Sequence, residues 1–228
     1  MLFVWMEFSE IPEKYQGLPV KDCGDALIVP GMVDLHAHAP QYAFRGLGMD
    51  LELLEWLNTH TFPEEAKYSN EVYAKRAYTM YVEELKKSDV TRAVIFATMH
   101  VEGTKILMEL LEKSGLSAYV GKVNMDRNGG KDLEEKSAEK SLEETKRWLA
   151  ETDGRFLHVR PILTPRFIPS CTDELMRGLA ELQREKKLPV QSHLSENPGE
   201  IAWVKELCPN VLNYSEAYEQ FGLFGGDC

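Results

Sequence analysis

The stretch "PGMVDLHAHAPQY", Pro30–Tyr42, ends an apolar run with two histidines, His36 and His38, one residue apart. We predict a strand at about Met32–His38. Alternate residues of a strand share a face, so Asp34 and both histidines are expected to point the same way. Two neutral imidazoles on one face form half of a zinc-type site. The pair alone also fits a loop-capping histidine beside a packed one, so the rest of the chain must supply further ligands.

Strands and helices alternate along the rest of the chain. Four more apolar, β-rich runs follow in "TRAVIFAT", "SAYVGKVNM", "RFLHVRPILTP" and "LPVQSHLSE", with amphipathic segments between them. This alternation predicts an α/β fold with a parallel sheet. A closed (β/α)8 barrel needs eight strands and typically ~250 residues. The chain has 228 residues, and its pattern fits either a smaller open sheet or an incomplete barrel.

Capping residues predict where two of the helices begin. Ser69 or Asn70 can cap the helix in "NEVYAKRAYTMYVEELKKS". Asn197, Pro198 and Glu200 supply a cap, a first-turn proline and an N3 glutamate for the helix in "PGEIAWVKELC".

The motif "VQSHLSEN" offers a third imidazole, because His193 lies at the end of the fifth predicted strand. In a barrel this is the edge that carries the chemistry. Glu196 follows three residues later and fits a carboxylate that handles protons beside a metal-activated water. It also fits an ordinary acid at the entry of the next helix.

The motif "ILTPRFIPS" places Arg166 and Phe167 after the fourth predicted strand. An arginine fork can reach two acceptors on one planar edge, such as O6 and N7 of guanine. A phenylalanine can stack on a base. A surface arginine and a core phenylalanine are the alternative interpretation.

Composition excludes several classes of protein. The net charge of −11 argues against a nucleic-acid surface. No run approaches the ~20 apolar residues of a membrane span, and the opening "MLFVWM" lacks the basic leader of a signal peptide. The four cysteines form no Cys-x-x-Cys pair. We therefore expect a cytoplasmic protein that binds neither nucleic acid nor membrane.

Taken together, these stretches resemble the guanine deaminase branch of the amidohydrolase superfamily. "PGMVDLHAH" alone indicates the superfamily. Gln41 in "HAPQY", together with "LLEWLNTHTFPEE", "GKVNMD", "TPRF" and "HLSEN", narrows the resemblance to guanine deaminases, from about Pro30 to the end of the chain.

The resemblance implies hydrolytic deamination of guanine to xanthine and ammonia. It implies one Zn²⁺ per subunit, with Fe²⁺ as an alternative because imidazole suits both ions, and a homodimer in the full-length form. It assigns metal binding to His36, His38 and His193, proton transfer to Glu196, purine binding to Gln41 and Arg166, and pocket lining to Phe167.

The resemblance also implies that the chain is truncated at both ends. Residues 1–29 would be a remnant of a small β-sandwich. Residues 30–228 would form an incomplete (β/α)8 TIM-type barrel of about the first five βα units, without a later active-site histidine and metal-binding aspartate. Two alternatives stay open at this point. One is another amidohydrolase, such as a chlorohydrolase or an adenosine-type deaminase, and the other is a non-catalytic product that binds metal or purine.

Overall fold

The computed structural model describes residues 12–15, 17–19, 21, 23–130 and 132–223. The chain divides into two units, residues 1–30 and 31–228. In the first unit, the described residues contain one 3-10 helix, η2 (Glu13–Tyr15), and no strand. Residues 1–11 of the expected β-sandwich remnant lie outside the described residues, so the remnant stays a prediction. None of the described helices is long and apolar enough to cross a membrane.

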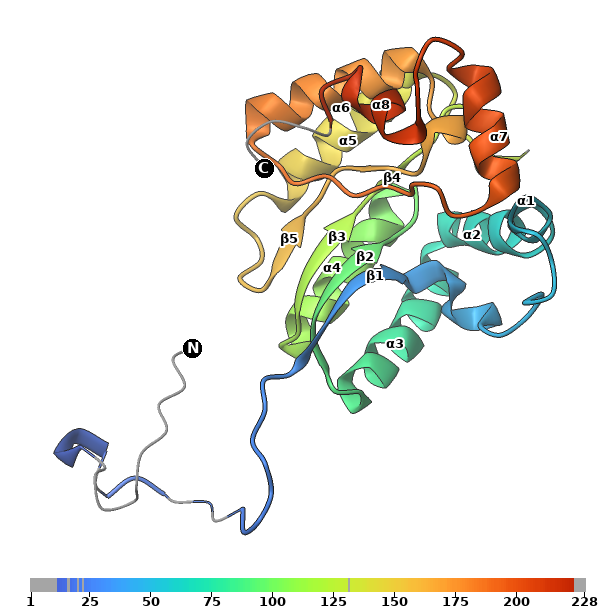
Figure 1. Cartoon of the computed structure of the whole chain (residues 1–228). Helices are drawn as coiled ribbons and strands as arrows, with labels where there is room; N and C mark the ends of the chain where they lie inside the picture. The colour runs from blue at the N-terminus through green and yellow to red at the C-terminus, as the bar shows by residue number, and fades with distance from the viewer. Residues whose placement is uncertain (1–11, 16, 20, 22, 131, 224–228) are drawn as a thin grey trace. The chain divides into compact units, whose positions relative to one another are not determined.

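The second unit is built on parallel strands, as the sequence predicts (Figure 1). The main sheet has the order β1-β2-β3-β5, and a two-stranded sheet pairs β4 with β6. Every pairing is parallel. The strands are β1 (Met32–His38), β2 (Val90–Phe96), β3 (Ser117–Gly121), β4 (Val123–Asn124), β5 (Val159–Pro161) and β6 (Thr164–Pro165).

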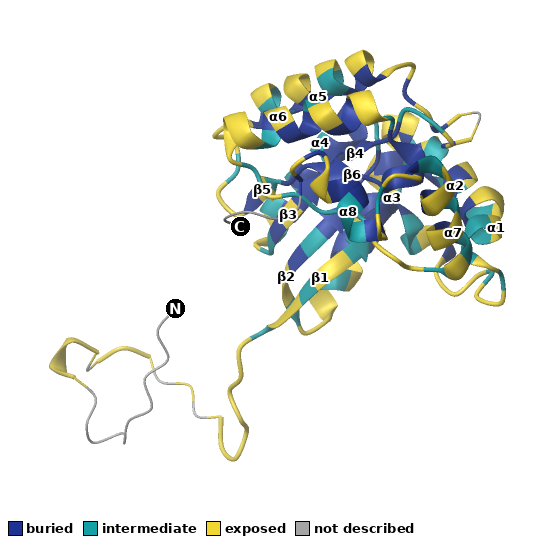
Figure 2. Cartoon of the chain, turned by 45° about the horizontal axis from the view of Figure 1, so that its top comes forward, coloured by how far each residue is buried: buried dark blue, intermediate teal, exposed yellow. Residues whose placement is uncertain are grey.

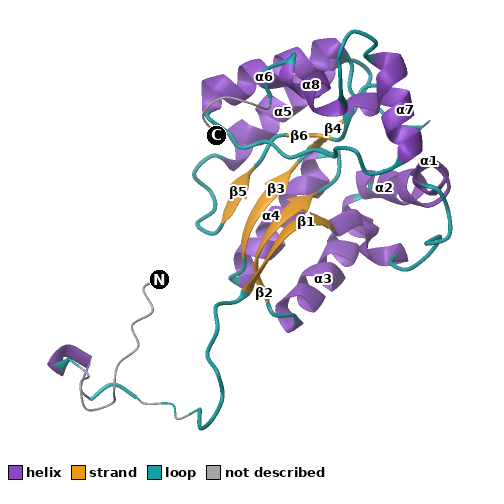
Figure 3. Ribbon diagram, in the orientation of Figure 1, coloured by secondary structure: helices purple, strands orange, loops and turns teal. Residues whose placement is uncertain are grey.

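Helices connect the strands and pack beside the sheet (Figure 3). The α-helices are α1 (Leu53–Trp56), α2 (Phe62–Ala66), α3 (Glu71–Lys87), α4 (Val101–Ser114), α5 (Ala138–Thr152), α6 (Asp173–Lys186), α7 (Pro198–Leu207) and α8 (Tyr214–Glu219). Shorter turns are the 3-10 helices η3 (Ala39–Phe44), η5 (Lys67–Ser69) and η6 (Ile168–Ser170), and the π-helix η4 (Leu57–Thr61) between α1 and α2. Asn70, rather than Ser69, caps α3 by accepting from two backbone N–H groups.

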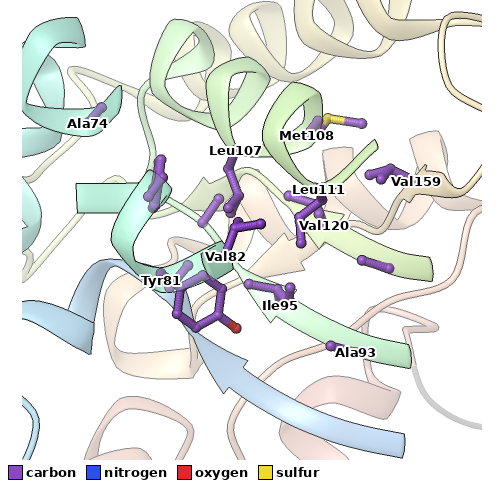
Figure 4. Close-up of a cluster of buried hydrophobic side chains, with 14 of the residues drawn as sticks. Ala74, Tyr81, Val82, Ala93, Ile95, Leu107, Met108, Leu111, Val120 and Val159 are labelled. Carbon is purple, nitrogen blue, oxygen red and sulfur yellow. The ribbon is translucent and has the colours of Figure 1, made fainter. Parts of the chain in front are cut away.

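One face of the sheet packs against α3 and α4 (Figure 4). Ile95 and Val120 of the strands meet Leu107 and Leu111 of α4, and all four side chains are fully buried. By contrast, β1 is exposed over much of its length (Figure 2). Burial of apolar area against these two helices therefore supplies much of the stabilisation of the sheet.

A β-bulge in β1 corrects one expectation from strict alternation. The register shifts between Asp34 and Ala37. Asp34 pairs with Ala93, whose side chain belongs to the helix-facing core, whereas His38 pairs with Phe96 on the opposite face. The bulge adds one residue to the strand, which reverses the side to which the following side chains point. Asp34 consequently does not share a face with the histidines.

The fifth predicted strand, "LPVQSHLSE", is not a strand in the structure. It forms one isolated parallel bridge, Val190 with Leu163. Backbone hydrogen bonds still hold it beside the β6 region, because Gln191 N–H donates to Leu163 and His193 N–H donates to Arg166. Pro165 has no N–H to donate to the Gln191 carbonyl, and Pro189 has none to donate in the other direction, which prevents a longer ladder. The segment nevertheless delivers His193 to the carboxyl edge of the strands.

The start of α7 has the predicted capping box. Asn197 Oδ1 accepts from the Gly199 N–H. One carboxylate oxygen of the fully buried Glu200 accepts from the N–H groups of Glu196 and Asn197, and the other accepts from the Tyr214 hydroxyl. Glu200 therefore fixes the backbone on which Glu196 stands.

We expect Glu200→Ala to lower the free energy of unfolding by roughly 1–3 kcal/mol, because it leaves buried donors without an acceptor. Glu206→Ala is the matched control, since Glu206 is exposed on the same helix, and should change stability by less than about 0.5 kcal/mol. Urea unfolding followed by circular dichroism measures both. Equal losses in the two variants would contradict the role given to Glu200.

Candidate active site

Three histidines from two distant segments converge at the carboxyl edge of the strands. His36 and His38 end β1, and His193 comes from the segment beside β6. One ring nitrogen of each lies within 4.8 Å of the others, and the Nε2 atoms of His38 and His193 are 2.9 Å apart. Two nitrogens that bind one zinc ion at ~2.0–2.1 Å each lie no more than ~4 Å apart. The His38–His193 pair lies within this limit, and the cluster as a whole, at up to 4.8 Å, is slightly wider than a closed ligand set.

A buried phenylalanine, Phe96, packs against all three imidazole rings. The Phe96 ring is stacked on His38 with centroids 4.4 Å apart. Its centroid lies 5.1 Å from that of His36 and 4.6 Å from that of His193. Sequence reasoning missed Phe96, although its place at the end of β2, in register with His38, follows once the strands are paired.

The surroundings keep the imidazoles neutral. Burial, reinforced by the Arg166 guanidinium, lowers the pKa of His193 to about 3. Burial also places the pKa of His38 well below its ordinary value, with His193 and Arg166 contributing in the same direction. The pKa of His36 is lowered by burial, against an opposing effect of Asp34. At neutral pH the rings therefore offer lone pairs rather than protons.

The tautomer of His193 follows from its neighbour. Its Nδ1 lies 2.6 Å from the Arg166 carbonyl oxygen. A carbonyl only accepts, so Nδ1 carries the hydrogen and the neutral ring keeps its lone pair on Nε2. That lone pair is directed at His38. A ring held in this way, with its second nitrogen donating to a backbone carbonyl, is the usual arrangement of a metal-binding histidine, and the donor set fits a divalent ion.

A cavity of about 230 Å³ adjoins the histidines. All seven residues singled out in the sequence line it: His36, His38, Gln41, Arg166, Phe167, His193 and Glu196. Three apolar residues complete the wall, namely Leu53, Trp56 and Leu57. These three lie in the motif "LLEWLNTHTFPEE", but sequence reasoning assigned them no place in the site, because their contact with the cavity depends on how α1 and η4 pack.

Glu196 stands exposed at the rim of the cavity. Partial burial of its carboxylate raises its pKa, and the neighbouring Glu200 carboxylate adds to this rise. Such a group keeps a proton to higher pH than an ordinary glutamate does, which suits a residue that exchanges protons near neutral pH. Its neighbour Ser195 has a positive φ of 56°, a backbone conformation that few non-glycine residues adopt.

Arg166 is not a surface residue. Its side chain is 2% exposed and pairs with Glu65, which is also 2% exposed. Nη1 donates to Glu65 Oε2 at 2.5 Å and Nη2 donates to Oε1 at 3.3 Å. Gln41 Nε2 donates to the same Oε1 at 3.2 Å. The guanidinium carbon also lies 5.2 Å from the centroid of the Phe62 ring.

Sequence reasoning missed Glu65. It lies in "TFPEEA" beside Glu64, and two acids after a helix-entry proline look like ordinary first-turn residues. Only the packing of α2 against the segment after β6 distinguishes the two. Phe167, in turn, is 4% exposed and belongs to a buried cluster, and it also lines the cavity.

A model of the amidohydrolase family matches residues 27–227. The chain belongs to this family. The guanine deaminase of Dictyostelium discoideum is 43% identical to it over 206 residues, which are 90% of this chain and 45% of that protein. The crystal structure of guanine deaminase from C. acetobutylicum with bound guanine has a TM-score of 0.92 and 50% identity, and covers 96% of this chain and 52% of that chain.

The comparisons confirm the resemblance to guanine deaminases that the motifs indicate. This amidohydrolase chain spans about half the length of the curated relatives it matches. An adenosine deaminase from Xanthomonas campestris with bound zinc is 20% identical, with a TM-score of 0.69, over 85% of this chain and 42% of that chain. A likeness at this identity shows the fold alone.

The low pKa of His193 predicts how stability varies with pH. Between pH 6.5 and about 3, the unfolded chain binds a proton at this ring that the folded chain does not bind. The free energy of unfolding of the metal-free chain should therefore fall as pH falls, by up to about 1.4 kcal/mol per pH unit from this group. We expect His193→Gln to flatten this dependence.

Urea unfolding at about pH 7 and about pH 5 measures the effect. Between these two values His193 of the unfolded chain takes up a proton, whereas His193 of the folded chain does not. His158→Gln is the control, since His158 is exposed and lies outside the cavity. A wild-type chain whose stability changed with pH no more than that of His193→Gln would refute the assignment.

Proposed function

We propose that this chain carries the metal site and base-binding cavity of a guanine deaminase, which hydrolyses guanine to xanthine and ammonia. The observation that carries the proposal is the convergence of seven residues, predicted from three separate stretches of sequence, on one cavity. The likeness to guanine deaminases at about 40–50% identity supports it. We also infer that the parallel sheet is part of a (β/α)8 barrel, as its structural likeness to these relatives suggests.

His36, His38 and His193 would hold the metal, with zinc as the first choice and Fe²⁺ as the alternative. Their neutrality and mutual distances support this role. When bound, such an ion supplies Lewis acidity and makes water a nucleophile near neutral pH. The remaining steps depend on side chains around the cavity.

Glu196 moves the protons in the proposed reaction. It takes a proton from the attacking water as the oxygen adds to the carbon that bears the amino group. It then delivers this proton to a ring nitrogen, takes the second proton from the added hydroxyl and gives it to the departing amine as the carbon–nitrogen bond breaks, so that ammonia leaves and a carbonyl forms. The raised pKa of Glu196 supports this exchange.

Gln41 and Arg166 would hold the purine by its polar edge, and Phe167 would pack against the ring. Leu53, Trp56 and Leu57 would exclude water from the opposite wall. The homodimer and the cytoplasmic location stay predictions. A chlorohydrolase or an adenosine-type deaminase is disfavoured, because relatives with those activities share the fold at 20% identity or less.

Zinc binding tests the first half of the proposal. We expect about one zinc ion per chain, measured by equilibrium dialysis followed by elemental analysis. His38→Ala and His193→Ala should each abolish near-stoichiometric binding, because each removes one of three ligands. His158→Ala should bind as the wild-type chain does. Binding that survives loss of either ligand would place the metal elsewhere.

Ammonia release from guanine by the zinc-loaded chain tests the second half. Glu196→Gln should lower kcat by roughly 10²–10⁴, because the amide cannot exchange protons, while KM changes little. Glu206→Gln, on the exposed face of α7, is the matched control. Zinc and guanine binding without any ammonia release by the wild-type chain would favour the non-catalytic alternative.

A further inference from the structure

The carboxylate of Glu65 contacts both residues that are proposed to hold the purine. Oε2 accepts from Arg166 Nη1, and Oε1 accepts from both Arg166 Nη2 and Gln41 Nε2. Glu65 is 2% exposed and does not itself line the cavity. It therefore acts on a ligand only through its two neighbours.

Glu65 fixes which end of the Gln41 amide is available. A carboxylate only accepts hydrogen bonds, so the amide nitrogen must be the atom that faces it. The amide oxygen is then the part of Gln41 left for a ligand in the cavity. Gln41 consequently offers an acceptor rather than a donor.

Glu65 also changes what Arg166 offers. The ion pair neutralises the guanidinium and uses two of its five N–H groups. An unpaired buried arginine would favour an anion such as a carboxylate or a phosphate. A paired one favours a neutral acceptor.

At Gln41 and Arg166 the cavity wall thus presents an acceptor and a donor, and the charge of the donor is cancelled by Glu65. Their complement is a neutral lactam, in which a ring N–H lies beside a carbonyl, as at N1 and O6 of a 6-oxopurine. Adenine presents the opposite polarity, with a ring acceptor beside an amino donor.

We propose that Glu65 is a positioning residue that sets this polarity, and that through Gln41 and Arg166 it makes the cavity select a neutral 6-oxopurine over a 6-aminopurine. The proposal rests on the proposed function, because it requires a purine in the cavity. It assigns Glu65 no contact with the ligand and no part in proton transfer.

Hypoxanthine and adenine are suitable probes, because they differ in the polarity of this edge and both lack the 2-amino group that would leave from guanine. Calorimetric titration of the zinc-loaded chain should give at least roughly tenfold tighter binding of hypoxanthine. In Glu65→Gln the new amide can donate as well as accept, so the Gln41 amide can flip and place its nitrogen toward the cavity. The preference should then fall to about twofold or less.

Glu64→Gln is the matched control. Glu64 lies next to Glu65 on α2, its carboxylate pairs with Lys67, and it does not line the cavity. This variant should keep the wild-type preference. Because it also loses an ion pair from the same helix, it distinguishes the polarity of the cavity from general damage to α2.

Gln41→Met provides a second variant, since it removes the acceptor and leaves the Glu65–Arg166 pair intact. It should lose the preference for hypoxanthine even if circular dichroism finds Glu65→Gln unfolded. An unchanged preference in Gln41→Met, or in a folded Glu65→Gln, would overturn the inference and leave the proposed function standing. A wild-type chain that binds neither purine would instead overturn the proposed function.

Discussion

The candidate site depends on the packing of three imidazole rings against one buried phenylalanine. Phe96 ends β2, and its ring contacts His36, His38 and His193. It brings together the end of β1 and a segment more than 150 residues later in the chain. Burial at this cluster also lowers the pKa of each ring and so favours the neutral form, which a set of metal ligands requires. The packing that brings the three rings together therefore also favours their neutral form.

A second constraint is the buried ion pair between Glu65 and Arg166. Burying two charges is costly, and a pair of this kind contributes little net stability compared with apolar packing. Its value lies in geometry, because it fixes α2 against the segment after β6 and orients the Gln41 amide. A carboxylate that binds no ligand can in this way determine what its neighbours offer to one.

Local sequence signals predicted much of this arrangement. The strand Met32–His38 and the capping box at Asn197 are confirmed to the residue, because each depends on neighbours along the chain. The bulge after Asp34, the single bridge at Val190 and the roles of Phe96 and Glu65 escaped prediction. All four depend on pairing or packing between segments far apart in the sequence, which no local pattern encodes. Glu64 and Glu65 look alike in sequence because only the contact of Glu65 with the distant Arg166 distinguishes them.

Different residues of the strands contribute to the site and to the stability of the sheet. The imidazoles, Gln41 and Glu196 gather where the strands end, around one cavity. Earlier on β1 the apolar side chains of Val33 and Leu35 are exposed instead, at 53% and 72%. Any element that covered Val33 and Leu35 would bury apolar area there without displacing a ligand at the carboxyl edge of the strands. Stability and chemistry can therefore change separately in this fold. The residues at the carboxyl ends of the strands line the cavity, and earlier residues of the same strands are available for packing.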